Sequence, residues 1–298
     1  MNARPVQYAT TSDGVSIAWN EAGEGPAILY FGPIPFTHAR EHWTIFEGFF
    51  GALARTFRVI YFDARGTGMS EREISGVSHA TLLMDAEAVI DAAKLDRFVA
   101  YSGSHWSMLG SWIALSLATA LPQRVTHVVL DSPFLNMREL DDAPFGRVAP
   151  TLAQTDWGVY VQTIFRVLSH SDSDSGPVGD LMAKAATRWV DAHVGLEYTK
   201  LSDATDMGDL LSHVQQPTIV LAHDPGLTVP DDALSALRRR SQGHSSCSIP
   251  TRPGFRWRVS SPPSSSHRCQ FRPATLRRPH LPPRSARCSS PTSSATPR

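Results

Sequence analysis

Three serines, Ser102, Ser104 and Ser107, lie between a short apolar run and a helical segment of small residues. The run Phe98–Tyr101 has the length of a buried strand, and the segment from about Ser107 to Ala120 is followed by Pro122, which ends a helix. A strand, a tight turn with a serine and a buried helix form the layout of a nucleophile elbow. The turn would expose the hydroxyl, and the helix N-terminus would favour developing negative charge. This stretch therefore predicts a serine nucleophile.

Two serines compete for that role. The usual elbow reads G-x-S-x-G, because the strained turn leaves no room for side chains two residues either side of the nucleophile. Counting from the strand selects Ser104, whose flanks are then Ser102 and Trp106, whereas counting back from the proline selects Ser107 or Met108. The disagreement indicates a lengthened turn. We place Ser104 first and Ser107 second, and the alternative that neither is a nucleophile stays open.

Strands and helices alternate through the first half of the chain, which predicts a mostly parallel, doubly wound α/β sheet. The chain opens with a hairpin pattern, Val6–Thr11 and Val15–Asn20, around a glycine-containing turn. Helical spacing follows over Trp43–Phe57 and Thr81–Lys94. Unbroken apolar runs predict neighbouring parallel strands with helices on both faces: Ala27–Phe31, Arg58–Phe62, Phe98–Tyr101, Val128–Leu130 and Thr218–Leu221.

The pattern changes between residues 134 and 213, where no strand run occurs. Helical stretches at Trp157–Leu168 and Val178–Val194 predict a helical cap inserted into an α/β core. We therefore expect the core to comprise residues 1–133 and 214–240, with a last helix over Pro230–Arg240.

The segment 241–298 differs from the rest in composition. It has ten arginines, no lysine and no acid, so residues 1–240 carry 18 basic and 28 acidic residues out of the chain's 28 of each. All three cysteines, Cys247, Cys269 and Cys288, lie in this tail, which argues against a disulfide framework in the body. Its bias toward Arg, Pro and Ser predicts a disordered tail that leaves the sheet incomplete, and a shift of reading frame near codon 241 would produce such a bias.

The block RVIYFDARGTGMSER, Arg58 to Arg72, contains the pattern D-x-R-G-x-G-x-S after a strand. With LATALPQRVTHVVL over Leu117–Leu130, it makes the chain from about Val6 to Arg240 resemble the α/β-hydrolase superfamily. Within this superfamily, the chain most resembles hydrolase-like domains that accompany bacterial cyclases and transcriptional regulators. The resemblance implies that Asp63 and Arg65 hold loops in place. The C-terminal part does not match.

The resemblance also implies a Ser–acid–His triad, and its acid has two candidates. Asp224 lies near the position of the family's acid, and Asp131 ends the preceding strand, where some members place theirs. The ordinary alternatives are a surface turn for Asp224 and a capping role for Asp131. The histidine that should follow the Pro230–Arg240 helix has no clear counterpart, since the tail histidines stand isolated among Ser, Pro and Arg.

An oxyanion hole should lie after the first central strand, at Gly32-Pro33-Ile34. Proline has no N–H, and the loss of one donor costs a factor of about 10²–10³ in rate. We expect either that Ile34 supplies the donor beside Gly32 or that the hole has degenerated. His105, beside the elbow, is a further candidate for the site, against its reading as an ordinary loop histidine.

The sequence thus predicts a serine hydrolase for a small ester- or amide-like substrate, or a catalytically degenerate module that binds a small molecule or regulates. No cofactor and no metal are expected, because Gly66-Thr67-Gly68 lacks the lysine of a phosphate loop and no metal-ligand spacing occurs. The absence of an N-terminal apolar signal, and an apolar run Met108–Leu121 too short for a bilayer, predict a cytoplasmic protein without a membrane partner. The arginine-rich tail lacks the lysines and aromatic spacing expected for nucleic acid. The oligomeric state is not specified.

Overall fold

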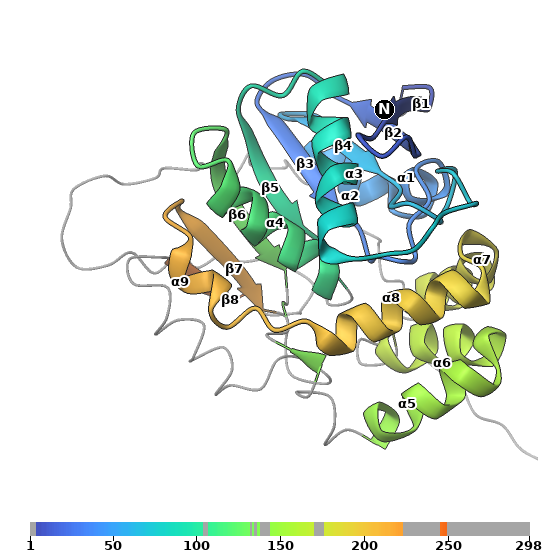
Figure 1. Cartoon of the computed structure of the whole chain (residues 1–298). Coiled ribbons are helices and arrows are strands. Elements are labelled where there is room, and N and C mark those ends of the chain that lie inside the picture. The colour runs from blue at the N-terminus through green and yellow to red at the C-terminus, as the bar shows by residue number, and fades with distance from the viewer. Residues whose placement is uncertain are drawn as a thin grey trace, which may run out of the picture. The chain divides into compact units, whose positions relative to one another are not determined.

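An eight-stranded sheet with the order β1-β2-β4-β3-β5-β6-β7-β8 organises the fold (Figure 1). The computed structural model describes residues 4–103, 107–131, 133, 136–137, 144–169, 176–222 and 245–248, which belong to one compact unit, Met1–Pro262. Apolar runs form most of its strands, because such runs can be buried on both faces. The strands are β1 (Gln7–Thr10), β2 (Ser16–Ala22), β3 (Ala27–Phe31), β4 (Arg58–Phe62), β5 (Phe98–Ser102), β6 (Val125–Asp131), β7 (Thr218–Ala222) and β8 (Ser245–Ser248).

The sheet is parallel from β4 to β8, whereas the hairpin β1–β2 joins β4 in antiparallel orientation. The five apolar runs predicted as neighbouring parallel strands are β4, β3, β5, β6 and β7 in that order, which confirms the predicted fold class. β8 corrects one expectation, because Ser245–Ser248 pairs with β7 although the tail was expected to lie outside the sheet. The remainder of segment 241–298 lies outside the described residues.

Helices cover both faces of the sheet, as predicted. In Figure 1, α3 and α4 lie across one face, while α2 packs against β4 on the other side, with a separate apolar cluster. A capping box between Ser78 and Thr81 begins α3. The helices are α1 (Glu41–Ile45), α2 (Glu47–Leu53), α3 (His79–Ala92), α4 (Met108–Ala120), α5 (Pro144–Thr155), α6 (Trp157–Ser169), α7 (Gly176–Trp189), α8 (Ala192–Ala204) and α9 (Leu210–His213).

Two helix predictions need correction. The pattern Trp43–Phe57 forms two short helices, because Phe46 between them leaves the helical conformation, with φ −110° and ψ 34°. The predicted helix Val178–Val194 ends at Trp189, where Val190 instead forms an antiparallel bridge with Thr67. The helices α5 and α8 were not predicted. The predicted helix Pro230–Arg240 lies outside the described residues.

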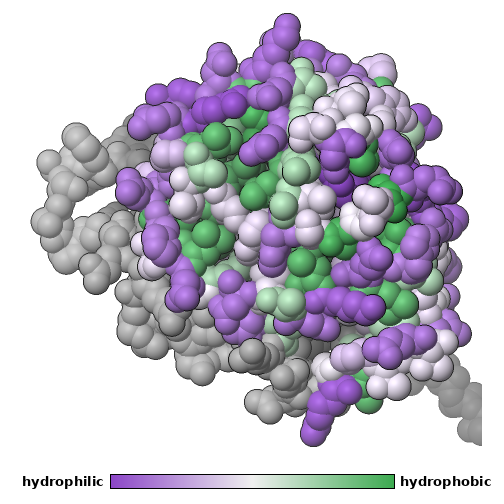
Figure 2. All heavy atoms as spheres, in the orientation of Figure 1, coloured by the Kyte–Doolittle hydropathy of each residue, from purple (hydrophilic) through white to green (hydrophobic). Residues whose placement is uncertain are grey.

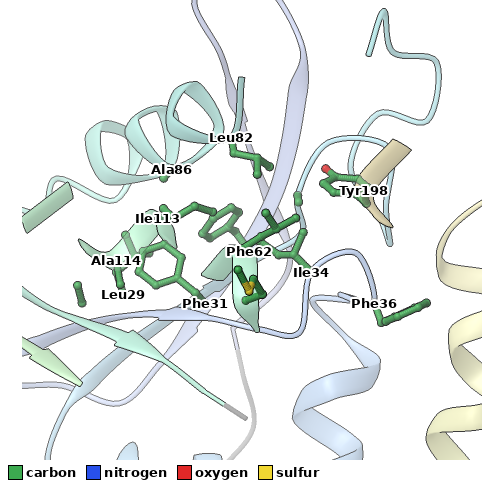
Figure 3. Packing of buried hydrophobic residues seen from close by; sticks show 14 of the residues in the cluster. Leu29, Phe31, Ile34, Phe36, Phe62, Leu82, Ala86, Ile113, Ala114 and Tyr198 are labelled. Atoms are coloured by element: carbon green, nitrogen blue, oxygen red, sulfur yellow. The ribbon is translucent and has the colours of Figure 1, made fainter. Parts of the chain in front are cut away.

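The larger apolar cluster fills the space between the sheet and α3 and α4. Figure 3 shows Phe31 and Phe62 beside Leu82, Ile113 and Ala114, and these side chains are almost fully buried. Phe31 and Phe62 meet edge to face, with ring centroids 5.9 Å apart, a favoured arrangement of aromatic rings. On the face seen in Figure 2, apolar residues reach the surface in small groups separated by polar ones. Within the described residues, no helix is both long enough and apolar enough to cross a membrane.

The block after β4 joins the core to the helical insertion, a name we use for α5–α9. Arg65 is fully buried and forms ion pairs with Asp85 at 2.7 Å and with Asp13 at 2.7 Å. The hydrogen bonds from Arg65, followed by one from Thr11, lower the pKa of Asp13 to about 2. The Tyr198 hydroxyl of α8 donates to the Arg65 carbonyl at 2.8 Å.

A second set of contacts joins the same block to the end of α7. The N–H of Gly68 donates to the Trp189 carbonyl at 2.7 Å, and Arg72 forms an ion pair with Asp191 at 2.9 Å. These contacts and that of Tyr198 all involve the block Arg58–Arg72, so its polar residues have a structural role that needs no catalytic explanation. The block therefore joins the helical insertion to the loop at the C-terminal end of β4.

Candidate active site

The turn after β5 lies at the centre of the sheet, between the ends of β3 and β6. Residues 103–107 separate the last residue of β5 from the first residue of α4. The Gly103 N–H donates to the Phe31 carbonyl at 3.0 Å, which ties the start of the turn to β3. A Cβ atom on Gly103 would overlap the hydroxyl and ring of Tyr30, so this position requires glycine.

Ser107 occupies the N-cap position of α4, but its side chain does not cap the helix. The buried hydroxyl instead donates to the Gly32 carbonyl at 2.5 Å, across from α4 to the loop after β3. Below it, the hydroxyls of Ser102 and Ser111 are 2.8 Å apart. The Ser102–Ser111 contact joins the end of β5 to α4. The Ser107 hydroxyl proton is donated to a carbonyl and not to a general base.

The loop after β3 was predicted to provide the oxyanion hole. Its Gly32 carbonyl accepts two hydrogen bonds, one from Ser107 and one from the Ile34 N–H at 2.9 Å. The Ile34 N–H, the predicted donor, is therefore used within its own loop, and the Ile34 side chain is buried (Figure 3). In this conformation, neither Pro33 nor Ile34 offers a free N–H to a substrate.

Asp131 is the last residue of β6, directly beside the turn. The register pairs Ser102 with Leu130, so Asp131 stands opposite Gly103 on the neighbouring parallel strand. Burial raises the pKa of Tyr101, and the negative charge of Asp131 raises it further. Burial also raises the pKa of Tyr30, and the neighbouring Tyr101 and then the charge of Asp131 raise it further. The carboxylate of Asp131 is thus close enough to influence two side chains that support the turn.

Three tyrosines form a row across the sheet under this region. Tyr61, Tyr30 and Tyr101 each occupy the penultimate position of β4, β3 and β5, and the register places them side by side. The ring of Tyr30 lies 5.9 Å from that of Tyr61 and 5.2 Å from that of Tyr101. The tyrosine row was not predicted, although its signal, a tyrosine at or directly before the end of three apolar runs, is present in the sequence.

A buried polar cluster lies at one end of the tyrosine row and was also not predicted. The ring of His42 lies 5.2 Å from Tyr61 and 4.9 Å from Trp189, and Asp63 follows β4 nearby. One polar atom of each of these four residues has no hydrogen-bond partner within the described part of the chain. Burial, followed by the neighbouring His38, lowers the pKa of His42 to about 3, so this imidazole is neutral at pH 7.

We expect Asp63 to make the stability of the protein depend on pH. Burial raises its pKa to about 7, while the N–H groups of Ala39 and Met69 favour the carboxylate. An unfolded aspartate ionises near 3.8, so the protein should lose stability as the pH rises from about 4 to about 7. We expect Asp63→Asn to remove this loss, so that the unfolding free energy of the variant rises relative to the parent by up to about 1.4 kcal/mol per pH unit.

Urea titrations between pH 4.5 and pH 8 measure this difference, and Asp96→Asn, at an exposed position, controls for the lost negative charge. Asparagine can still accept the hydrogen bond that Met69 donates to Asp63 at 2.8 Å. A difference between Asp63→Asn and parent that stays constant across this range would show that Asp63 is ionised in the folded protein.

The structure brings some of the predicted site residues together and does not describe others. Ser107, Gly32 and Ile34 form one hydrogen-bonded group, and Asp131 borders the same turn. Within the described residues, no histidine hydrogen-bonds to this group: His38 and His42 contact one another, and His79 contacts Thr205. Three predicted residues, Ser104, His105 and Asp224, lie outside the described residues, so their roles stay predictions.

Comparison of the chain with known proteins identifies a matching family. A family model described as the alpha/beta hydrolase fold matches residues 36–240. A search of curated proteins finds no match. Among solved structures, an esterase from Exiguobacterium antarcticum has a TM-score of 0.68 at 16% identity, covering 85% of this chain and 91% of its own.

Two further solved structures are similar over the same region. A hydrolase from Pseudomonas aeruginosa PA01 has a TM-score of 0.66 at 22% identity, with 83% of this chain and 91% of that chain covered. Est816, described as an N-acyl homoserine lactone degrading enzyme, has a TM-score of 0.67 at 25% identity, with 82% and 92% covered. At 16% and 22% identity, the likeness to the Exiguobacterium esterase and the Pseudomonas hydrolase shows the fold alone.

Proposed function

Because the chain belongs to the alpha/beta hydrolase fold family, we propose that it is a serine hydrolase for a small ester- or amide-like substrate, with Ser104 as its nucleophile. The observation that carries this proposal is the turn after β5. It lies at the C-terminal end of a central strand and leads into α4, a helix long enough to favour negative charge at its N-terminus. Ser104 is the first residue after Gly103 in this turn.

The proposed chemistry is acyl transfer in two steps. The Ser104 hydroxyl oxygen attacks the substrate carbonyl, its proton passes to a general base, and the protonated alcohol or amine leaves from the acyl-enzyme. Water then attacks the acyl-enzyme, releasing the acid and restoring the serine. Ser107 is the second candidate for the nucleophile, but its proton is donated to Gly32. The base is not assigned.

Asp131 is better supported than Asp224 as the acid of the triad. It follows Leu130, the register partner of Ser102, and so stands opposite Gly103, the residue that precedes Ser104 in the sequence. Neighbouring parallel strands lie about 4.8 Å apart, which is within reach of a shared histidine. We further propose that the helical insertion is a cap over the site, since its anchoring contacts fall on the loop after β4, at the same edge of the sheet.

The substrate class follows from the chemistry of the fold and is supported by two names among its structural neighbours. One neighbour is an enol-lactonase from Burkholderia xenovorans LB400, and another degrades N-acyl homoserine lactones. A lactone is a cyclic ester, so both names refer to compounds that contain an ester group. We therefore place small esters, including lactones, before amides as substrates of this chain.

A second candidate function is a catalytically degenerate module that binds or senses a small molecule. One specific observation favours it: the Ile34 N–H, which the oxyanion hole requires, is used within its own loop. Without a second donor, the developing oxyanion would lose stabilisation worth about 10²–10³ in rate. Catalysis would therefore require this loop to change conformation when a substrate binds.

Labelling with a fluorophosphonate probe tests the proposed function. We expect the full-length protein to be labelled at Ser104, Ser104→Ala to abolish the labelling, and Ser107→Ala to weaken it by disturbing the Gly32 contact. Peptide mapping of the modified serine identifies the site. Ser212→Ala, an exposed serine on α9, is the matched control and should be labelled like the parent.

Two outcomes would change the assignment. Labelling that persists in Ser104→Ala and disappears in Ser107→Ala would make Ser107 the nucleophile. A parent protein that is folded, as judged by circular dichroism, but is not labelled would support the binding module.

A further inference from the structure

A groove between the N-terminal segment and α1 forms a cavity of about 690 Å³. This volume falls in the range of small-molecule sites, about 300–1,000 Å³. The groove lies beside β2, and the sheet order places β4 and β3 between β2 and the elbow strand β5. At about 4.8 Å per strand, this separates the groove from the proposed nucleophile by roughly 14 Å. Its side chains include Arg4, Val6, Tyr8, Arg40, Trp43 and Met69.

The floor of this N-terminal groove is largely apolar. Trp43 is 7% exposed, and its indole N–H donates to the Asn20 amide oxygen at 2.7 Å. The amide nitrogen of Asn20 in turn donates to the Ala39 carbonyl at 2.6 Å. Because these polar groups are already paired, the floor offers a ligand the apolar atoms of Trp43 together with half-buried Val6 and Met69. An aromatic or aliphatic body fits such a floor.

The rim carries guanidinium groups. Arg4 contacts Glu21 at 2.6 Å, but Glu21 also contacts Arg58 at 2.6 Å, so this group of three keeps a net positive charge. Arg40, exposed at the start of α1, has no ion pair or hydrogen bond from its side chain within the described residues. Glu47 adds one negative charge, so the three arginines Arg4, Arg40 and Arg58 outnumber the two glutamates Glu21 and Glu47 by one.

This positive rim stands out on a chain whose residues 1–240 have ten more acids than bases (28 against 18). Guanidinium groups recognise carboxylates through paired, charge-assisted hydrogen bonds. We propose that the N-terminal groove binds a small carboxylate with an apolar, aromatic body, whose ring lies against Trp43 and whose carboxylate pairs with Arg40. This site is separate from the proposed hydrolase site and does not depend on it.

Titration of the full-length protein with sodium benzoate, followed by ligand-observed NMR at pH 7 and 0.15 M salt, tests the proposal. We expect saturable binding that Arg40→Gln weakens at least tenfold. Benzamide, which has the same ring without the charge, should bind at least tenfold more weakly than benzoate. Arg97→Gln removes the same charge at a distant exposed position and should leave the benzoate affinity within twofold of the parent.

A second variant, Thr44→Trp, tests whether benzoate binds in the groove itself. Thr44 lines the groove at an exposed position of α1, so Thr44→Trp should fill the cavity and abolish benzoate binding while the circular dichroism spectrum stays unchanged. Binding that survives both Arg40→Gln and Thr44→Trp would place benzoate elsewhere, for example at the hydrolase site, and would overturn the proposal. No saturable binding by the parent, or equal affinity for benzamide, would also overturn it.

Discussion

Arg65→Met is expected to lower the free energy of unfolding by about 3–5 kcal/mol, because it leaves a buried carboxylate without its cation. Arg65 and Asp85 are both fully buried, and the Arg65 Nε donates to Asp85 at 2.9 Å. The main-chain N–H of Arg65 donates to the same carboxylate at 3.0 Å. Methionine keeps the volume and flexibility of the side-chain stem but cannot supply the charge. Urea denaturation monitored by fluorescence measures the loss.

Arg188→Met is the matched control for this prediction. Arg188 pairs with Glu41 at 3.2 Å, but their side chains are 62% and 37% exposed, so the pair should contribute less than about 1 kcal/mol. The double variant Arg65→Met/Asp85→Asn should recover part of the stability, because asparagine removes the unpaired charge. If Arg65→Met costs no more than Arg188→Met, the buried pair does not stabilise this fold.

The ion pairs of Arg65 with Asp13 and Asp85 show why the sequence predicted the role of the block Arg58–Arg72 better than its geometry. The pattern D-x-R-G-x-G-x-S indicated loop-holding residues, and Asp63 and Arg65 do form such contacts. The partner Asp85 could not be predicted, because it lies on α3, twenty residues further along the chain, and was read only as part of an amphipathic helix. Side-chain pairing between distant elements depends on tertiary packing that local patterns do not encode.

The strands were predicted well because burial on both faces demands unbroken apolar runs, as in Val59 and Ile60 of β4. The helical insertion was predicted less well. Its break at Val190 follows from a bridge to Thr67, more than a hundred residues earlier, and not from a proline or glycine at that position. The pattern of apolar residues continues past this break, so periodicity alone joined α7 to the start of α8.

The proximity of three candidate residues was predicted, whereas their roles stay predictions. The sequence placed Ser107, Gly32 and Ile34 near one another, and the structure joins them by hydrogen bonds. It could not predict that Gly32 would accept both bonds, because that depends on the path of the loop. The tyrosine row, in contrast, was readable, since Tyr30 and Tyr61 hold the same position in two neighbouring runs. The rings of this row leave no room for a side chain at Gly32 and Gly103, which directly follow β3 and β5.

Gly103→Ala is expected to lower the free energy of unfolding by about 3 kcal/mol and to abolish labelling of Ser104 by the fluorophosphonate probe, even where the variant remains folded. The added methyl would overlap both the hydroxyl and the ring of Tyr30, which is itself packed between Tyr61 and Tyr101. Because the rings on both sides hold Tyr30 in place, we expect the turn to shift instead. Ser104, which follows Gly103, would shift with it. Thermal denaturation and probe labelling of the same preparation measure the two effects.

Three comparisons separate this clash from other effects of alanine. Gly48→Ala, on α2, meets no atom within 4 Å and should raise the stability by about 0.5–1 kcal/mol, as expected for glycine in a helix. In Gly32→Ala the new methyl would lie 2.5 Å from the Tyr61 hydroxyl but 3.0 Å or more from its ring, so Tyr61→Phe should restore much of the loss. Tyr30→Phe should not rescue Gly103→Ala, because the ring carbons also overlap the methyl. A Gly103→Ala variant as stable as the parent would mean that the turn does not rest against Tyr30, and the position proposed for Ser104 would lose its physical basis.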